Sequence, residues 1–143
     1  MVVAASCPLG ASCPDTVSVT FLGVGGFLMD TASWHDKSWV VGVSLGGESK
    51  AYDWNRLRRE GVVNDVVGGM PVVLAIATDR VSFFAFARPD ASTQFVARGD
   101  SLVSRNDAYG LDGRGSSGTL EPVFASQEFW HSWRTFHPST TTY

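Results

Sequence analysis

The chain has 143 residues, a length typical of one domain, and 44% of them are hydrophobic, which is enough for one core. Its net charge of −3, from 11 Lys and Arg against 14 Asp and Glu, offers no basic surface for phosphates and excludes nucleic acid as a partner. No window approaches the roughly 18 apolar residues of a membrane helix, and the apolar start is too short for a signal peptide. We therefore expect a soluble chain without membrane insertion or an export signal, in a compartment that the sequence does not identify.

The first 15 residues are rich in small residues and proline, and this composition predicts an N-terminal arm. Cys7 and Cys13 lie in this arm, and the five residues between them do not match the spacing of a structural zinc pair. A disulfide that closes a small loop and two free thiols both remain open. Residues 17–22 (VSVTFL) then read as a strand, and 27–29 as a second short one.

A hairpin and a short helix follow. Residues 39–45 (WVVGVSL) and 48–52 are separated by two glycines, which is the sequence pattern of a β-hairpin. Asp53 is placed to cap a helix over 54–60, and Gly61 is placed to end it. We therefore expect one short helix near the middle of the chain.

The next segments predict a sheet. Residues 62–67 lead through a pair of glycines into 71–77 (PVVLAIA), a continuous apolar run typical of a central strand buried on both faces. Residues 81–87 (VSFFAFA) are expected to pair back against it. Residues 94–97 and 101–103 then suggest a further hairpin.

The last third of the chain predicts a loop and a helix. Glycine, serine and charged residues dominate 108–118, which indicates an exposed loop. Ser126 is placed to cap a helix over 127–137 that Pro138 ends, with His131 directed to solvent. We expect this helix to cover the aromatic side chains of 81–87. At helical spacing, its own aromatic residues share one face: Phe129, Trp130, Trp133 and Phe136.

Together these elements predict an α+β, β-rich fold. It consists of an antiparallel sheet or a small barrel-like body, one short central helix and a C-terminal helix with an aromatic face. We expect a single globular domain over 16–138, an arm over 1–15 and a tail over 139–143. No repeat and no linker divides the chain further.

Three groups of residues resemble the bacterial domain of unknown function family 3179, over about 39–138. The first is VVGVSLGGESKAY, with Gly42, Gly47, Glu48, Ala51 and Tyr52 at the pattern positions. The second is VVNDVVGGMPVVL, with Asn64, Asp65, Gly68, Gly69, Pro71 and Val72. The third is WHSWRTFHP, with Trp130, Trp133, His137 and Pro138. The resemblance implies a fold-level grouping, because the family has no assigned activity.

The chain departs from this family where chemistry would be expected. Many members carry a histidine shortly before the central Asn-Asp pair and a Cys-Pro-x-Cys motif after the following strand. In a gapless alignment these three positions fall on Glu60, Ala77 and Arg80. A histidine and two thiols could bind a soft metal or support redox chemistry, and the residues present here cannot replace them. We therefore expect no metal and no cofactor, and we expect the three positions to lie close together.

Few other patterns point to chemistry. His35, His131 and His137 have no ligand spacing, and His137 is better placed as a group near the negative end of a helix. Asn64 and Asp65 form the most informative polar pair. They either satisfy backbone groups around the nearby turn, or Asp65 lines a pocket as an acid or base. We favour the structural interpretation.

Two hypotheses about function follow. In the first, the chain is a non-catalytic binding or structural domain that has lost its Cys/His site, and its surface, within a homo-oligomer or toward another partner, carries the function. In the second, it is an enzyme or binder of an unidentified small molecule. Its pocket would then be bordered by five polar residues, namely Glu48, Glu60, Asn64, Asp65 and Arg80.

Overall fold

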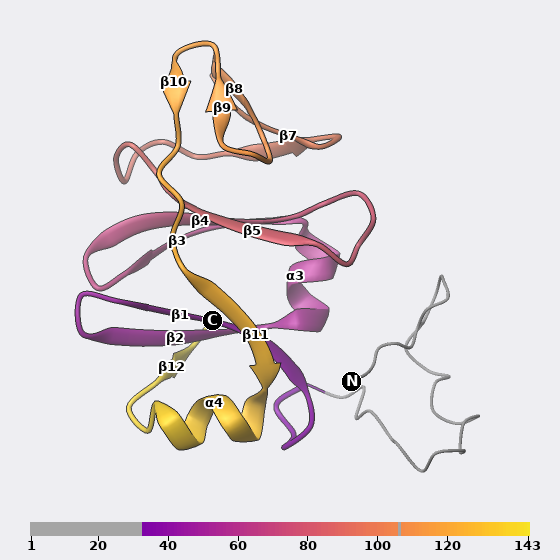
Figure 1. Ribbon diagram of the computed structural model, residues 1–143, viewed down its shortest axis with the longest axis vertical. Coiled ribbons are helices and arrows are strands. Elements are labelled where there is room, and N and C mark those ends of the chain that lie inside the picture. Colours follow the sequence, from indigo (N-terminus) through magenta and orange to yellow (C-terminus); the bar gives the residue numbers. More distant parts are fainter. Residues whose placement is uncertain (1–32, 106) are drawn as a thin grey trace.

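The computed structural model describes residues 33–105 and 107–143, and within them the chain forms three sheets stacked in layers (Figure 1). The layers are four, three and five strands wide. The predicted β-rich α+β class is confirmed, and the described strands do not close into a barrel. The predicted arm, the strand at 17–22 and both cysteines lie outside the described residues.

The first sheet has the order β11-β1-β2-β12. β1 (Trp39–Leu45) and β2 (Glu48–Asp53) form the predicted hairpin with the register Leu45↔Glu48. β11 (Ala125–Phe129) returns from late in the chain to pair antiparallel with β1. β12 (Thr141–Thr142) adds to the free edge of β2 and is parallel to it, so the segment predicted as a tail contributes a strand.

The second sheet is the central layer. β3 (Val62–Val67), β4 (Met70–Ile76) and β5 (Phe83–Ala87) follow one another as antiparallel neighbours, with β4 in the middle. Residues 72–76 are all buried, because both faces of β4 are covered by another layer. The prediction of a central strand buried on both faces is confirmed.

The third sheet covers the opposite side of the central layer (Figure 1). It has the order β10-β9-β8-β7-β6, and β6 and β7 form the predicted hairpin. The prediction of an exposed loop over 108–118 is wrong, because this region supplies three strands and the buried ring of Tyr109. The five strands of this sheet are β6 (Val96–Arg98), β7 (Ser101–Ser104), β8 (Asp107–Gly110), β9 (Arg114–Gly115) and β10 (Gly118–Thr119).

The central helix has the predicted bounds. α3 (Trp54–Glu60) begins where the Asp53 side chain accepts a hydrogen bond from the Arg56 backbone N–H, 3.1 Å away. It ends at Gly61, whose φ of 77° is the left-handed conformation that favours glycine at a helix end. Leu57 is its one buried residue, and α3 therefore closes one end of the space between the first two sheets.

The C-terminal helix is shorter than predicted. α4 covers Trp130–Phe136, and residues 125–129 are extended because β11 pairs with β1. Ser126 therefore caps no helix, and Phe129 stacks on Trp39 at 4.3 Å between ring centroids. Phe136 is 76% exposed, so the predicted four-residue aromatic face is wrong, whereas His131 is exposed as expected.

The predicted cover for the aromatic strand is also wrong. α4 packs on β1 and β11, where the Trp133 ring lies so close to Gly42 that a β-carbon on Gly42 would collide with it. In β5, Phe83 and Ala85 face the first sheet, and Phe84 and Phe86 face the third. The third sheet is thus the cover that buries Phe86.

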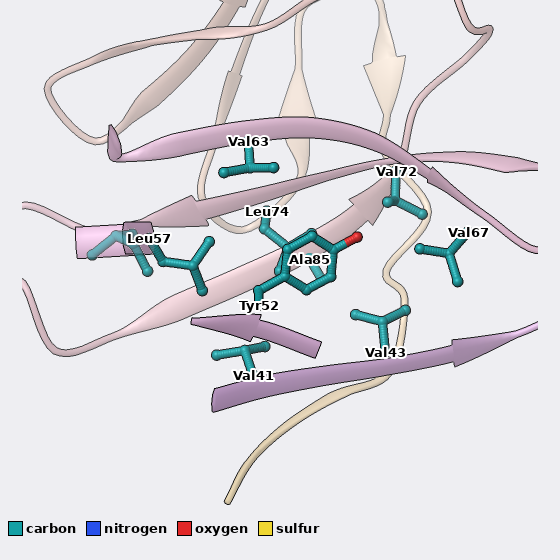
Figure 2. Packing of buried hydrophobic residues seen from close by; sticks show 10 residues of the cluster. Val41, Val43, Tyr52, Leu57, Val63, Val67, Val72, Leu74 and Ala85 are labelled. Atoms are coloured by element: carbon teal, nitrogen blue, oxygen red, sulfur yellow. The ribbon is translucent and has the colours of Figure 1, made fainter. Parts of the chain in front are cut away.

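Two hydrophobic clusters fill the spaces between the layers. The larger lies between the first two sheets, where Val41, Val43 and Tyr52 meet Val72, Leu74 and other residues of the central sheet (Figure 2). The second joins the central sheet to the third around Val73, Phe86, Phe95, Leu102 and Tyr109. No helix in the described part of the chain has the length and apolar character needed to cross a bilayer.

Candidate functional site

Asn64 and Asp65 are neighbours on β3 and therefore point to opposite faces of the central sheet. Asp65 faces the first sheet, where its Oδ2 accepts a hydrogen bond of 2.9 Å from the Tyr52 hydroxyl. The same oxygen lies 2.7 Å from the Lys50 ammonium. Asn64 faces the third sheet and has no contact with this group. The predicted pair is thus divided between two interfaces.

The Asp65 group, which we define as Asp65, Lys50 and Tyr52, links β3 to β2. Partial burial disfavours the charged carboxylate, but hydrogen bonds from Lys50, the Val66 N–H and Tyr52 outweigh it, so the pKa of Asp65 lies below its ordinary value. Burial and the adjacent Asp65 charge raise the pKa of Tyr52 well above its ordinary value. At neutral pH the group therefore holds an ionised carboxylate and a protonated phenol.

Tyr143 covers the outer side of this group. Its ring centroid lies 5.3 Å from that of Tyr52, and the Arg56 guanidinium carbon lies 4.2 Å above the Tyr143 ring. Glu60 accepts a bond of 2.6 Å from Arg56 and lies 3.4 Å from the Tyr143 hydroxyl. Burial, followed by the negative charge of Glu60, raises the pKa of Tyr143. The structure therefore brings Glu60 to the same side of the molecule as Asp65.

Glu48 connects two turns. The turns Gly46-Gly47 and Gly68-Gly69 both have positive φ at both residues, which is the conformation of two-residue hairpin loops. They pack against each other so closely that a β-carbon on Gly46 would lie 2.7 Å from the Gly68 carbonyl oxygen. The Glu48 carboxylate accepts a hydrogen bond from the Gly68 N–H and holds the turns together.

On the other face, the Asn64 side chain behaves like a strand backbone. Its Nδ2 donates to the Phe95 carbonyl and its Oδ1 accepts from the Phe95 N–H, each at 2.9 Å. Both polar backbone groups of Phe95, which is 2% exposed, are satisfied in this way. Asn64 therefore anchors the segment that leads into β6.

Arg88, which the sequence analysis missed, completes this second interface. It is 5% exposed, and it donates hydrogen bonds to four carbonyl oxygens, those of Val72, Asp65, Ala91 and Thr93, at 2.7 to 3.2 Å. Burial lowers the pKa of its guanidinium from the ordinary value, although a guanidinium stays charged at neutral pH. The only sequence signal was an arginine directly after an apolar strand. Two of its carbonyl partners, those of Ala91 and Thr93, follow it closely in the chain, and the other two, those of Asp65 and Val72, come from β3 and β4.

Arg80 does not join the other four polar residues through any described contact. It lies in the turn before β5 with a φ of 63°, and it is exposed. The same turn is fixed by Asp79, whose pKa is lowered by hydrogen bonds from the Ser82 N–H, the Val81 N–H and the Ser82 hydroxyl. The structure thus groups Glu48, Glu60 and Asp65 near Tyr52, and places Asn64 and Arg80 elsewhere.

The three positions of the expected Cys/His set do lie at one end of the central sheet. The Ile76 N–H donates to the Gly61 carbonyl at 2.8 Å, so the residues next to these two, Ala77 and Glu60, are close along the sheet edge. The Arg80 N–H donates to the Ala77 carbonyl at 2.9 Å. These backbone hydrogen bonds place the three positions at one end of the central sheet, but no described contact joins the side chains of Glu60 and Arg80.

The model of a family described as Protein of unknown function (DUF3179) matches residues 24–140, most of the chain. The chain belongs to this family. The match begins before the region of visible resemblance and therefore includes residues upstream of β1. Neither the curated proteins nor the solved structures compared with the chain contain a match.

The DUF3179 pattern residues have structural roles in this chain. Gly42 makes room for Trp133, Gly68 packs under the first hairpin turn, and Asn64 holds Phe95. His137 stacks on Trp133 at 3.7 Å between ring centroids. Within 33–105 and 107–143, no cluster of three His, Cys, Asp or Glu side chains has the geometry to hold a metal ion.

Proposed function

We propose that this DUF3179 chain is a non-catalytic binding or structural domain. The observation that supports the proposal is that the polar side chains singled out by sequence are used to join layers and turns. Asn64 is bonded to Phe95, Asp65 to Tyr52 and Lys50, and Glu48 to Gly68. An acid–base or ligand site needs such groups directed into a cavity.

The residues at the Cys/His positions also support the proposal. Glu60, Ala77 and Arg80 are adjacent to, or part of, backbone hydrogen bonds at one end of the central sheet, and the proposal is that a histidine and two thiols at these positions would form the lost site. Here the set consists of a carboxylate engaged with Arg56, a methyl group and an exposed guanidinium. These groups lack the soft ligands that such a site would need. We propose that the chain keeps the DUF3179 fold without the metal-binding or redox chemistry that a histidine and two thiols could support.

Restoring the three side chains tests this proposal. We expect Glu60→His/Ala77→Cys/Arg80→Cys, made in a Cys7→Ser/Cys13→Ser background, to bind Co²⁺ and show thiolate-to-cobalt absorption, and the background protein to show none. Glu121→His/Ala97→Cys/Arg114→Cys is the matched control. It makes the same exchanges at exposed positions, with Ala97 and Arg114 on strands that are not neighbours in the third sheet. Equal absorption from both triple variants, or none from either, would contradict the idea of a lost site.

A metal and small-molecule inventory of the unmodified protein tests the same proposal directly. Elemental analysis and native mass spectrometry should give a mass without a stoichiometric metal or retained small molecule. The same spectra report the oligomeric state. A stoichiometric ligand would overturn the proposal.

One observation favours the alternative of an enzyme or small-ligand binder. Lys50 and Arg56 lie over the ring of Tyr143, and the carboxylates of Asp65 and Glu60 lie beside it. A phenol surrounded by two cations and two carboxylates has the chemistry of a polar binding site. A small molecule retained in the mass spectrum and lost from Lys50→Met would establish this alternative.

A further inference from the structure

An apolar groove lies beside β5, the outer strand of the central sheet. It has a volume of about 340 Å³, and its walls come from β5, from the turn before β9 and from residues 122–125. Phe83 and Phe84 are only half-buried in these walls, next to Leu111 and Val123. Apolar surface is thus left in contact with water, and a group that covers it would be stabilised by the hydrophobic effect.

The segment that leads into β11 forms one wall of the groove and is fixed at two points (Figure 1). The Val123 N–H donates to the Ala85 carbonyl at 2.9 Å, which holds the segment on β5. Ala125 pairs with Val43 of β1, which holds it on the first sheet. Phe124, between these two anchors, is 80% exposed and is not among the walls. Because its neighbours are fixed in the wall, the Phe124 ring projects into solvent and does not fill the groove of its own chain.

The groove and the exposed ring beside it are complementary to a second copy of the same surface. A twofold axis between a projecting group and an adjacent recess brings each projection to the recess of the partner. We propose that two copies of this chain associate through this face, each placing its Phe124 ring in the groove of the other. Val81, which is 69% exposed and two residues before Phe83, extends the apolar surface of the face. An aromatic ring buried in a partner's groove is the kind of contact that dominates the energy of an interface.

Opposite charges at the two ends of the groove favour the same arrangement. Arg80 is exposed in the turn before β5, and no described side chain pairs with its guanidinium. Asp112 is exposed on the wall toward the other end of β5, where the next residue, Gly113, packs against the Phe86 ring. Asp112 Oδ1 accepts a hydrogen bond from the Arg114 N–H, and its Oδ2 has no described partner. An antiparallel arrangement of two copies directs each Arg80 toward the partner's Asp112.

The neighbouring charges agree with this pattern. Asp79, next to Arg80, is engaged by hydrogen bonds within its own turn. Glu121, whose backbone pairs with the end of β5, is exposed at the Asp112 end, which therefore carries two carboxylates against the one guanidinium of Arg114. The inference goes beyond the proposed function and does not rest on it, because Co²⁺ binding tests the lost site and self-association tests this face.

Sedimentation of the full chain from roughly 1 µM to roughly 1 mM tests the proposal, with a reductant that keeps Cys7 and Cys13 from linking chains. The face is small, so we expect a reversible dimer with a dissociation constant of about 10 µM or higher. Phe124→Ser should raise this constant at least about tenfold. Phe136→Ser is the matched control, because Phe136 is 76% exposed on α4, and it should change nothing. A monomer at every concentration, or equal effects of the two variants, would overturn the proposal.

A charge exchange tests how the two copies are oriented. Arg80→Asp and Asp112→Arg should each weaken the dimer by about three- to tenfold, because each places like charges opposite one another. Combining the two substitutions in one chain restores opposite charges across the twofold axis and should recover most of the affinity. Additive weakening in the double variant would reject the antiparallel arrangement.

A photo-crosslinking side chain identifies what the ring contacts. In a mixture of isotopically labelled and unlabelled chains, Phe124→p-benzoylphenylalanine should link labelled to unlabelled chains at residues of the groove, such as Phe83, Phe84 and Leu111. Links confined to one chain would show that the chain covers its own groove, and links between chains at a different surface would show another interface. Either result would reject the proposal. Thermal unfolding of Phe124→Ser at a concentration where the protein is monomeric should match that of the unmodified chain, and a marked loss would mean that Phe124 packs within its own chain.

Discussion

The two faces of the central sheet are joined to their neighbours by different chemistry. On one face Asp65 forms an ion pair and accepts a phenol hydrogen bond, and the largest apolar cluster surrounds it. On the other face Asn64 uses an uncharged amide, and Arg88 donates to carbonyl oxygens. Asn64 and Asp65 are consecutive in β3, yet Asp65 meets the side chains of Lys50 and Tyr52, whereas Asn64 meets the backbone of Phe95.

The difference follows from what each partner layer presents. β2 presents side chains, Tyr52 and Lys50, that complement a carboxylate. The segment before β6 presents bare backbone at Phe95, and an amide side chain carries both the donor and the acceptor needed to pair with it. Arg88 then satisfies the carbonyl groups that strand pairing leaves over. The charged interface should therefore respond to pH, and the amide interface should not.

Removing Arg88 should have the largest effect. Arg88→Met keeps much of the side-chain volume but leaves four carbonyl oxygens without their donor, so we expect a loss of about 3–5 kcal/mol in the free energy of unfolding. Urea denaturation followed by tryptophan fluorescence measures this loss. Arg98→Met, at an exposed arginine on β6, is the control and should change stability little. Equal losses from both variants would contradict a special role for Arg88.

Removing the amide of Asn64 should cost less. Asn64→Leu leaves the buried N–H and C=O of Phe95 unpaired, and we expect a loss of about 2–3 kcal/mol. Gln94→Leu removes the same functional group from an exposed neighbour and should be close to neutral. Hydrogen exchange at Phe95 should rise in Asn64→Leu only, and an unchanged Phe95 amide would show that the side chain does not hold this segment.

Acid should weaken the interface of Asp65 and leave that of Asn64 unchanged. Because the folded protein holds the pKa of Asp65 below its ordinary value, Asp65 stabilises the fold above about pH 4, and this contribution is lost as the pH falls through the lowered pKa. Stability measured from pH 6 to pH 3 should fall more in the unmodified protein than in Asp65→Asn. Asp79 and Asp90, whose pKa values are also lowered, act in both proteins and cancel in the comparison. Identical slopes would contradict the role of Asp65.

Glu48 should have the smallest effect. Its bond to the Gly68 N–H is exposed, so Glu48→Ala should cost less than about 1 kcal/mol. Glu48→Gln retains an acceptor oxygen and should keep most of that stability, as thermal unfolding would show. A loss from Glu48→Gln as large as that from Glu48→Ala would indicate that the carboxylate charge, and not the acceptor oxygen, is what matters at the paired turns.

The elements that the sequence predicted correctly are those defined by neighbours in the chain. Two glycines between apolar runs determine each of the first two hairpins, and Asp53 with Gly61 determines both ends of α3. The buried character of β4 follows from an uninterrupted apolar run. Each of these signals lies within a few residues, so no knowledge of the rest of the fold is needed.

The predictions that failed depend on distant contacts. Residues 127–129 were predicted as the start of a helix, but pairing with β1 makes them extended, and tertiary contacts overrode local preference. The strands within 107–119 are short and rich in glycine, and they join the third sheet because β8 pairs with β7, β9 with β8 and β10 with β9. The site shows the same limit, because Asn64 and Asp65 were recognised but Arg88, which reaches the distant carbonyl groups of Asp65 and Val72, was not.

The return of β11 to β1 has a consequence for the order of folding. The strands from β1 to β5 pair almost entirely with their chain neighbours, so they can form as soon as they have been synthesised. The outer edge of β1, in contrast, has no partner until β11 emerges from the ribosome, long after the first hairpin. During that interval an unpaired strand rich in valine is exposed, and any intermediate that aggregates should do so through β1.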